Sequence, residues 1–398
     1  MRILLLNQFF YPDSAGTSQF LTDLARHLAA SGHSVRVICG RSSYAGPPES
    51  TEPPPVRIVR ALDLPFSHGL LGRILSYASF ISGALCHGLL GPKPDLVVSL
   101  TTPPALSLVG SILKAAKGAR HFIWEMDVYP DIAVDLKVLH PDALLTRLIG
   151  VSLDASRRRA DGVIVLGECM RRRLIQRGVP ARNTHVAENW ADGYEIHPLP
   201  FPDPAPLRIL YSGNLGLAHD IDTVRGAIHH FRSDPRFQFD FAGAGTQRPA
   251  FEAFCQKHAI ANVSFTGYRP RRELARNLAA CHVGLVTQKP ATVGSVVPSK
   301  TYGLMAAGRP ILYIGPQDAT PARIIDRFDC GWQVDPGDFK TLIALFDHLS
   351  ASPHVVRDAG ARARESFLKF YGLPIGVARI SSILGVAQPQ AAFNAATV

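Results

Sequence analysis

Cysteine is scarce in this sequence, and no cysteines stand at the spacing of a metal or redox site. The chain of 398 residues contains six cysteines, too few for a disulfide scaffold. No two of them form a Cys-x-x-Cys pair, so we expect reduced structural thiols and no metal site. The chain also lacks a Gly-x-Gly-x-x-Gly fingerprint, because only Gly16 follows the long loop after the first apolar run. These absences argue against a disulfide-rich secreted protein, a zinc protein and a nicotinamide-binding domain.

Long charge-free segments that could cross a membrane are also missing. Residues 1–10 are apolar, but Tyr11-Pro12-Asp13 ends the run, which favours a buried first strand over a secretory signal. Residues 74–90 carry no charge, yet they fall just short of the ~20 residues that a spanning helix needs. The serines among them favour a core or interfacial helix. We therefore expect a cytoplasmic protein.

Acidic residues are fewer than basic ones, which indicates an anionic partner. The formal net charge is +10, and nucleotide phosphates, nucleic acid or an acidic membrane surface would each match it. Two arginine runs stand out, residues 157–159 and residues 171–173 followed by Arg177. They fall on predicted helices without interleaved aromatic residues, which favours a solvated face over nucleic-acid binding. Contact with an anionic leaflet stays open.

Short β-branched runs alternate with amphipathic segments along the chain, which is typical of parallel, doubly wound sheets. Residues 198–206 contain five prolines in nine positions and predict a semi-rigid linker, after which the pattern starts again. We predict an α/β protein with two Rossmann-like domains, residues 1–195 and 207–364, that face each other across a cleft. The linker covers residues 196–206, and residues 385–398 form a disordered tail. The predicted strands are residues 2–7, 34–39, 56–60, 95–100, 121–126, 162–166, 207–212, 237–242, 263–266, 283–287 and 310–314.

Ligands of such sheets bind beyond the carboxyl ends of the strands, where one carboxylate stands out. The predicted strand over residues 121–126 is followed by Asp127, which could take a proton or orient a hydroxyl. Glu125 and Asp131 compete for this role, and either could instead cap the next helix.

Glycine turns follow two strands of the second domain, and their backbone amides could meet a phosphate. One turn contains Gly213, Asn214 and Gly216, and the other contains Gly243 and Gly245. We interpret the Asp-x-Asp pattern at residues 220–222 as a helix cap, because acidic residues are favoured at a helix start.

Lys300 is the most informative residue of the second domain. Pro298 and Ser299 precede it at the start of a predicted short helix, with Ser299 as the N-cap. A cation is electrostatically unfavourable at this position, because the helix dipole favours anions there. If an anion binds at this helix start, Lys300 becomes its counter-ion.

Taken in order, these loops resemble those of the GT-B glycosyltransferases of family 4, which are retaining nucleotide-sugar enzymes. The resemblance is strongest to the bacterial branch that builds exopolysaccharides, O-antigens and capsules. It implies that the second domain holds the nucleotide diphosphate and that the first holds the acceptor. It also implies that the C-terminal helix, about residues 365–384, packs back on the first domain. The matching stretches are residues 7–16, 127–131, 188–190, 210–216, 243–245 and 297–310.

Two departures from the family pattern concern the donor site. The family's two glutamates, eight residues apart, are replaced by Ser295 and Gly303, and the second glutamate normally holds the ribose. The family's basic residue and Lys-Gly pair after the glycine turn are replaced by residues 217–220. These losses raise the demand on Lys300, with Lys289 or Arg248 as possible helpers.

The resulting hypothesis is sugar transfer, with retained configuration, from a nucleotide-diphosphate donor to a lipid-linked or polysaccharide acceptor. Asp127 and Lys300 would be catalytic, with Asp131 and Glu125 on the acceptor side. No metal or other cofactor is expected, and contact with the cytoplasmic face of the inner membrane is possible. A sugar-nucleotide epimerase and a basic nucleic-acid-binding protein stay open as alternatives, although we expect no nucleic acid. The donor-binding residues would be Gly16, Gly213, Asn214, Gly216, Gly243, Gly245, Pro298, Ser299 and Lys300.

Overall fold

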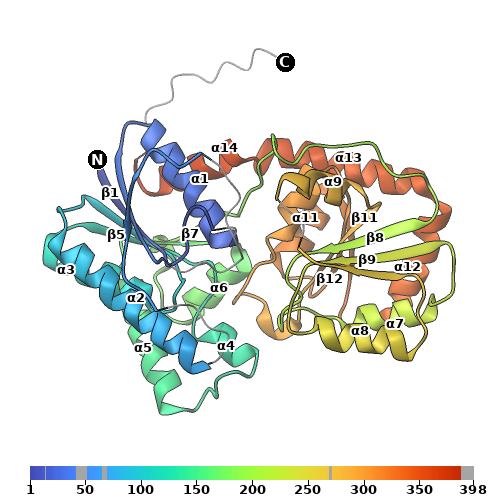
Figure 1. Ribbon diagram of the computed structural model, residues 1–398, viewed down its shortest axis with the longest axis horizontal. Coiled ribbons are helices and arrows are strands. Elements are labelled where there is room, and N and C mark those ends of the chain that lie inside the picture. Colours follow the sequence, from blue (N-terminus) through green and yellow to red (C-terminus); the bar gives the residue numbers. More distant parts are fainter. Residues whose placement is uncertain (14, 42–51, 65–69, 269–270, 387–398) are drawn as a thin grey trace.

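Two parallel β-sheets, each covered by helices, make up the computed structural model (Figure 1). It describes all residues except 14, 42–51, 65–69, 269–270 and 387–398. The first sheet has seven strands in the order β3-β2-β1-β4-β5-β6-β7, and the second has six in the order β10-β9-β8-β11-β12-β13. The predicted α/β class with two doubly wound parallel sheets is confirmed.

The central strands of the first sheet are largely apolar because helices cover both faces. In β1, for example, the four residues after Arg2 are all buried. The strands are β1 (Arg2–Leu6), β2 (Ser34–Cys39), β3 (Arg57–Arg60), β4 (Leu96–Ser99), β5 (Arg120–Trp124), β6 (Gly162–Val165) and β7 (Thr184–Val186). The helices are α1 (Gly16–Ala30), α2 (Leu70–Leu90), α3 (Leu106–Lys117), α4 (Asp131–Asp135), α5 (Leu144–Arg159) and α6 (Glu168–Gln176).

The second sheet has a core rich in phenylalanine. Phe237, Phe239 and Phe241 alternate along one strand and pack on Phe251 and Phe346 from the covering helices. The strands are β8 (Leu207–Ser212), β9 (Phe237–Ala242), β10 (Val263–Thr266), β11 (Val283–Thr287), β12 (Ile311–Ile314) and β13 (Gly331–Val334). The helices are α7 (Asp222–His230), α8 (Arg248–Lys257), α9 (Leu274–Ala279), α10 (Lys300–Ala306), α11 (Thr320–Phe328) and α12 (Phe339–Ala351).

Two strands were not predicted, β7 and β13, and both lie at a sheet edge. The sequence Thr-His-Val of β7 is too short to show a strand pattern, and Gly-Trp-Gln-Val of β13 begins with a glycine. Edge strands are half-exposed, so they lack the continuous apolar run that marks a central strand.

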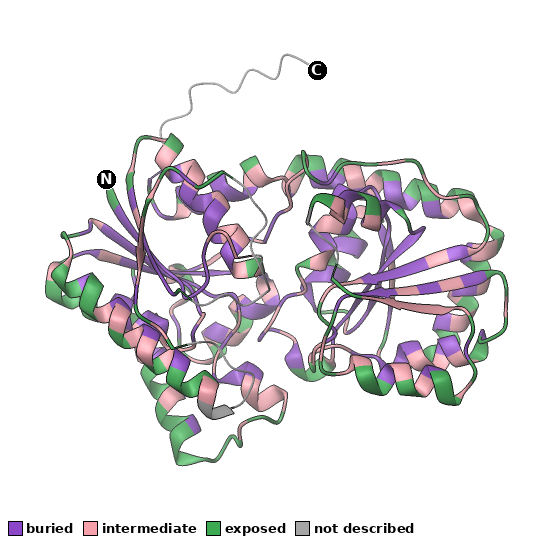
Figure 2. Ribbon diagram, viewed as in Figure 1, coloured by how far each residue is buried: buried purple, intermediate pink, exposed green. Residues whose placement is uncertain are grey.

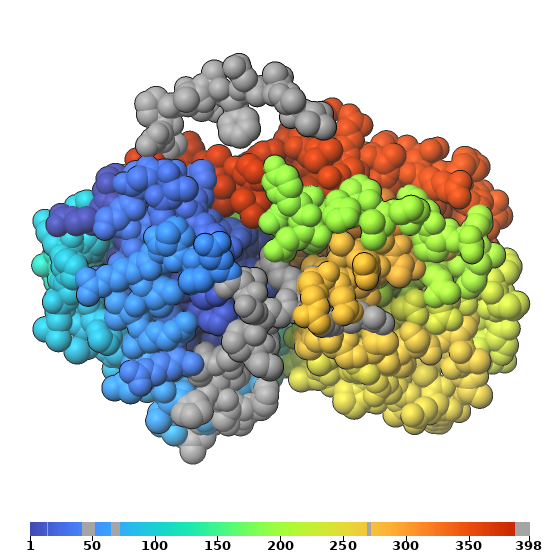
Figure 3. All heavy atoms as spheres, turned by 45° about the horizontal axis from the view of Figure 1, so that its top comes forward, coloured from blue at the N-terminus to red at the C-terminus, as the bar shows by residue number. Residues whose placement is uncertain are grey.

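The C-terminal helices cross from the second sheet to the first. α13 (Pro353–Phe370) and α14 (Leu373–Ile383) run along one side of both halves (Figure 1), as the space-filling view also shows in red (Figure 3). α14 contacts α1 and β6, and its Val377 and Ile380 belong to the core of the first sheet. The tail predicted from Gly385 begins too early, because Val386 is buried and its carbonyl lies 3.0 Å from His33 Nε2. The rest of that tail lies outside the described residues.

The proline-rich linker is held by one buried arginine. Arg309 donates to the carbonyl oxygens of Leu199 and Pro200, each at 3.0 Å, and to that of Ala279 at 2.9 Å. Its guanidinium also lies 4.0 Å from the ring centre of Phe201. The second domain thus fastens the linker to its own surface.

Burial is concentrated in the two sheets, and the exposed residues lie on the outer faces of the helices (Figure 2). α2 follows this pattern, because Ser76, Phe80 and Ala84 are fully buried while Ile74 and Leu75 are exposed. Among the described residues, no helix combines the length and apolarity needed to cross a bilayer. This outcome agrees with the prediction of a core or interfacial helix.

Candidate active site between the two domains

A cavity of about 350 Å³ lies between the two domains. Its walls come from the start of α1, the segment after Trp190, the carboxyl ends of β8 and β9, and the helices α9 and α10. Both domains therefore contribute, as the prediction of a shared cleft requires. The lining residues are Gly16, Gln19, Phe20, Asp23, Trp190, Ala191, Asp192, Glu195, Ile196, Leu210, Ser212, Gly213, Ala242, Tyr268, Leu274, Asn277, Leu278, Leu285, Ser299, Lys300, Gly303 and Leu304.

Lys300 lies in this cavity without a carboxylate partner in the part of the chain that the structure describes. Its Nζ atom donates to the Tyr211 hydroxyl at 2.9 Å and to the Asn214 carbonyl at 3.4 Å. The same atom lies 4.6 Å from the centre of the Tyr211 ring. Burial lowers the pKa of Lys300 to about 7, because neutral partners compensate the charge only in part. An anion entering the cavity would supply the missing countercharge.

His219 completes the surroundings of Lys300. Burial, together with the nearby Lys300, lowers the pKa of His219 to about 3, so the ring is neutral. Its Nδ1 lies 2.9 Å from the Thr287 carbonyl oxygen, which can only accept, so Nδ1 carries the proton. Its Nε2 is then an acceptor, 3.4 Å from Lys300 Nζ.

The glycine turns bring the backbone close to Lys300. Gly213 has a φ of +127°, and a Cβ there would lie 2.6 Å from Lys300 Cε. Gly243, with a φ of +131°, packs directly behind it, because a Cβ there would overlap the Gly213 carbonyl. Of the predicted donor-binding residues, Gly16, Gly213, Ser299 and Lys300 line the cavity. The cavity lining does not include the other five predicted residues, Asn214, Gly216, Gly243, Gly245 and Pro298.

Ser299 does not cap α10 as predicted. It occupies the N-cap position, but its backbone is already helical, with φ −76° and ψ −16°, and its side chain makes no capping bond. A capping side chain needs extended backbone to reach the following amides. The predicted cap at residues 220–222 is confirmed, because Asp220 accepts from the Thr223 amide at 3.2 Å and hydroxyl at 2.8 Å.

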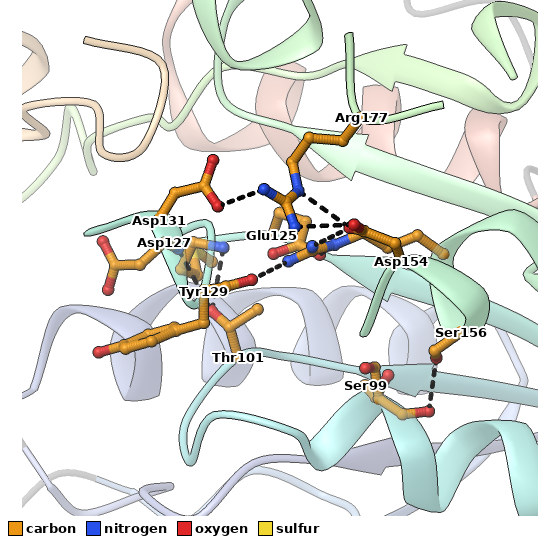
Figure 4. Close-up of polar contacts among 12 residues, drawn as sticks. Ser99, Thr101, Glu125, Asp127, Tyr129, Asp131, Asp154, Ser156 and Arg177 are labelled. Carbon is orange, nitrogen blue, oxygen red and sulfur yellow. Dashed lines mark hydrogen bonds and ion pairs between the residues drawn. The ribbon is translucent and has the colours of Figure 1, made fainter. Parts of the chain in front are cut away.

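Asp127 lies where the two domains touch. Its backbone pairs with that of Val296 from the second domain, and the Val128 amide donates to the Ser295 carbonyl at 2.8 Å. Burial, and secondly the charge of Glu125, raise the pKa of Asp127 to about 6. In Figure 4 its carboxylate points away from the neighbouring ion pairs. It does not line the cavity that holds Lys300.

Glu125 and Asp131 are both engaged in ion pairs (Figure 4). Glu125 is 1% exposed and accepts from Arg157 Nε at 2.7 Å. Asp131 receives Arg173 Nε at 2.8 Å and Arg177 Nη1 at 2.9 Å. The structure thus gives both carboxylates a partner within the first domain.

The arginine runs form the solvated face that the sequence predicts only in part, at Arg158, Arg159 and Arg172. The Arg157 side chain is 2% exposed, and Arg173 and Arg177 reach inward to carboxylates. Arg158 and Arg159 alone of the first run are exposed. Helical periodicity misled here because Glu125 and Asp131 come from distant segments, whereas Asp154 lies on the same helix as Arg157. The arginines that suggested nucleic-acid binding are therefore largely neutralised by carboxylates of the same domain.

The two positions where the family has glutamates, Ser295 and Gly303, lie in different surroundings: one is buried in a loop and the other lines the cavity. Ser295 is fully buried and donates to the Thr292 carbonyl at 3.0 Å. Gly303 lines the cavity, and a Cβ there would lie 3.5 Å from Leu278 Cδ1, an ordinary contact. Arg248 pairs with Glu252 at 2.7 Å and donates to the Gly243 carbonyl, so it holds a loop.

The sequence interpretation missed Tyr211, His219 and Asp23. Tyr211 and His219 bond Lys300, whereas Asp23 lines the cavity and accepts from Trp190 Nε1 at 2.9 Å. Only Tyr211 carried a signal, since it is a polar residue near the end of a predicted apolar strand.

Comparisons with known proteins identify the family of both domains. The family model of the glycosyl transferase 4-like domain matches residues 15–190. A second family model, that of the glycosyl transferases group 1, matches residues 206–351. Together they cover both domains, and the chain belongs to this family of glycosyltransferases. The expected resemblance is thereby confirmed.

Three similar proteins illustrate the relationship. The probable glycosyltransferase WbjE of Pseudomonas aeruginosa is 30% identical over 266 residues, 65% of this chain and 66% of its own. The putative colanic acid biosynthesis glycosyl transferase WcaI of Escherichia coli (strain K12) is 24% identical over 77% of this chain and 82% of its own. The structure of HepE from Anabaena in complex with UDP and glucose shares the GT-B fold, with a TM-score of 0.73, 15% identity, and coverage of 97% of this chain and 100% of that one.

We predict that the buried charge of Lys300 lowers the stability of the folded protein, because its partners are neutral groups. We expect Lys300→Met to raise the free energy of unfolding by about 1 kcal/mol at pH 6, because a buried cation without a carboxylate is replaced by an apolar chain. The pKa is about 7 in the folded state and near 10.5 in the unfolded state, so the unfolded chain binds more protons between these values. The stability of the original protein should therefore rise across that window, and the advantage of the variant should shrink.

Urea unfolding at pH 6 and pH 9 measures this difference. Lys257→Met, at an exposed lysine of the second domain outside the cavity, is the matched control and should show no such pH-dependent gain. A Lys300→Met variant that is less stable than the original protein at pH 6 contradicts the interpretation.

Proposed function

We propose that this protein transfers a sugar, with retained configuration, from a nucleotide-diphosphate donor to a hydroxyl of a lipid-linked or polysaccharide acceptor. The observation that carries the proposal is the uncompensated charge of Lys300 in a cavity built by both domains. A diphosphate is the group that gains charge as the sugar leaves it, and a fixed cation stabilises such charge in a dry site. The complex of HepE with UDP and glucose makes a UDP-sugar the first donor to test.

Each domain would serve one substrate. Lys300 and the backbone around Gly213 would hold the diphosphate in the second domain, and Gly16 would let the start of α1 approach it closely. During transfer, the bond between the anomeric carbon and the diphosphate oxygen breaks, and the acceptor oxygen bonds to that carbon. Asp127, with its raised pKa, would orient the acceptor hydroxyl or take its proton. We expect no metal, because Lys300 and two helix N-termini together would offset the charge of the diphosphate.

The role of Lys300 is tested by truncation. We expect Lys300→Ala to lower kcat by about 10²-fold or more, as loss of other donors to developing charge does. The assay follows release of the nucleotide diphosphate from candidate sugar nucleotides, with cell-surface glycolipids as acceptors. Lys257→Ala is the control, because this lysine of the second domain is exposed and does not line the cavity, and we expect it to keep its activity.

Two outcomes of this assay would contradict the proposal. Unchanged turnover of Lys300→Ala removes this residue from the mechanism. An isomerised donor formed without any acceptor indicates an epimerase instead.

We expect the titration of Asp127 to set the acid limb of the pH profile of kcat/KM. A carboxylate with a pKa of about 6 is active when ionised, so kcat/KM should fall as the pH drops through 6. We expect Asp127→Asn to lose about 10²-fold or more in kcat and to lose this acid limb. Asp142→Asn, at an exposed carboxylate of the same domain, should keep both. An Asp127→Asn profile that still falls at pH 6 assigns the limb to another group.

An exposed apolar stripe on α5 supports contact with a membrane. Leu144, Leu145, Leu148 and Val151 are 73%, 66%, 55% and 65% exposed, and this spacing places them on one face of the first two turns. That end of the helix projects from the first domain (Figure 1), and its surface is exposed (Figure 2). Exposed Arg147 lies within the same turns and pairs with Asp142 at 2.6 Å, and Lys137 is exposed in the segment before the helix. Apolar residues next to cations suit the interface of an anionic leaflet, where a lipid-linked acceptor would lie.

Vesicle binding tests this contact. We expect the protein to float with vesicles of anionic phospholipid. The double variant Leu144→Gln/Leu148→Gln should bind roughly tenfold or more weakly, because it lacks two leucines that would enter the bilayer. Leu368→Gln removes an equally exposed leucine from the second domain and should bind normally. Equal binding of the double variant and the original protein excludes the stripe as the contact.

A further inference from the structure

One loop of the second domain, residues 293–297, is bonded to the first domain. It joins the single turn η3 (Pro290–Thr292) to α10, and so leads directly to Ser299 and Lys300. On the side of the first domain, the Val128 amide donates to the Ser295 carbonyl at 2.8 Å, and Asp127 pairs with Val296. Inside the second domain, Gln288 Nε2 donates to the carbonyls of Thr292 and Val296 at 3.2 and 3.1 Å. The position of this loop therefore sets where Lys300 lies relative to Asp127.

Arg173 of α6 makes a further bond to the same loop. Its Nη1 donates to the Val293 carbonyl at 3.0 Å, while its Nε donates to Asp131 Oδ2 at 2.8 Å. Its Nη2 donates to Asp135 Oδ1 at 3.0 Å. One guanidinium thus holds two carboxylates of the first domain and a carbonyl of the second.

The carboxylates that hold Arg173 are themselves held in place. Arg177 bridges Asp131 and Asp154 at 2.9 and 2.7 Å, and Arg157 bonds Asp154 and Glu125 at 2.9 and 2.7 Å. Arg157 also donates to the Tyr129 carbonyl at 2.9 Å, in the turn that follows Asp127 (Figure 4). The turn that carries Asp127 and the arginine that reaches the second domain therefore belong to one bonded network.

Close packing leaves little freedom where Arg173 meets the loop. Gly294 has a φ of +81°, and a Cβ there would lie 2.8 Å from the Cys169 carbonyl and 3.3 Å from Arg173 Cβ. The loop thus approaches the backbone of α6 as closely as a glycine allows. A shift of the loop would break the bond from Arg173 to Val293.

We propose that Arg173 is a positioning residue for transfer, which holds the 293–297 loop against the first domain and thereby sets the separation between Asp127 and Lys300. This inference rests on the proposed function, because it gives these two residues roles in one reaction. The guanidinium is required for its shape, since its planar fork donates in three directions at once. The compact ammonium of a lysine cannot reproduce these directions.

Kinetics and nucleotide binding test the inference. We expect Arg173→Gln to lower kcat by roughly tenfold or more, because small misplacements of reacting groups are costly. The Kd for UDP should change little, because most of the residues proposed to hold the diphosphate, Lys300, Gly213 and Ser299 among them, belong to the second domain. Arg173→Lys should behave like Arg173→Gln. Arg171→Gln is the matched control, because Arg171 lies on the same helix and its bonds to described residues, Glu168, Thr184 and Ala181, all stay within the first domain.

A distance measurement tests the same inference without any activity. Cys86 in α2 is exposed and the other five cysteines are buried, so spin labels can be placed on Cys86 and on a Lys340→Cys variant in α12. We expect double electron–electron resonance between the two labels to give a broader distribution of interdomain distances in Arg173→Gln than in the Arg171→Gln control.

The outcomes separate this inference from the proposed function. A lowered melting temperature with normal kcat and an unchanged distance distribution reduces Arg173 to a stabilising residue and overturns the inference. Full activity of Arg173→Lys overturns the requirement for the fork. If the original protein transfers no sugar at all, the proposed function fails, whereas the distance distribution still decides whether Arg173 holds the domains.

Discussion

The charge of Lys300 is the constraint on which the rest of the site depends. An ammonium group at a helix start gains nothing from the helix dipole, and the described structure offers it a hydroxyl, a carbonyl and a neutral imidazole in place of a carboxylate. Such an arrangement is unfavourable for the isolated protein and favourable once an anion binds. Gly213 permits the close approach of the lysine, and Gly243 permits the close approach of the loop behind it. The surroundings of Lys300 thus give a reason for the glycines at positions 213 and 243, for the buried Tyr211 and for the neutral ring of His219.

The second organising feature is the contact between the domains at Asp127. The carboxyl ends of both sheets meet there, and the loop that precedes Lys300 is bonded to the strand end that carries Asp127. The arginines of α5 and α6 extend this contact into the first domain. The groups proposed to react, Asp127 and Lys300, come from opposite domains, and backbone pairing and a network of ion pairs connect the segments that carry them.

The central strands and the cavity-lining Lys300 could be predicted from the sequence, because both leave a local signal. A strand buried on both faces is a continuous apolar run, and a lysine at a helix start breaks a local electrostatic preference. The arginine network left no such signal. Arg157 looks solvated in a helical run, and only the fold brings Glu125 to it, beside Asp154 from the preceding turn of the same helix. Gly243 was likewise placed at the phosphate from its turn motif, whereas it packs one layer behind. Residues that act through tertiary partners are those that local patterns cannot assign.

The most direct test of the central claim is a crystal structure of the protein with UDP bound. The account predicts that Lys300 Nζ lies within hydrogen-bond distance of a diphosphate oxygen and that the nucleotide occupies the cavity bounded by Gly213, Ser299 and Gly303. A diphosphate bound elsewhere, with Lys300 still donating only to Tyr211 and Asn214, would contradict it.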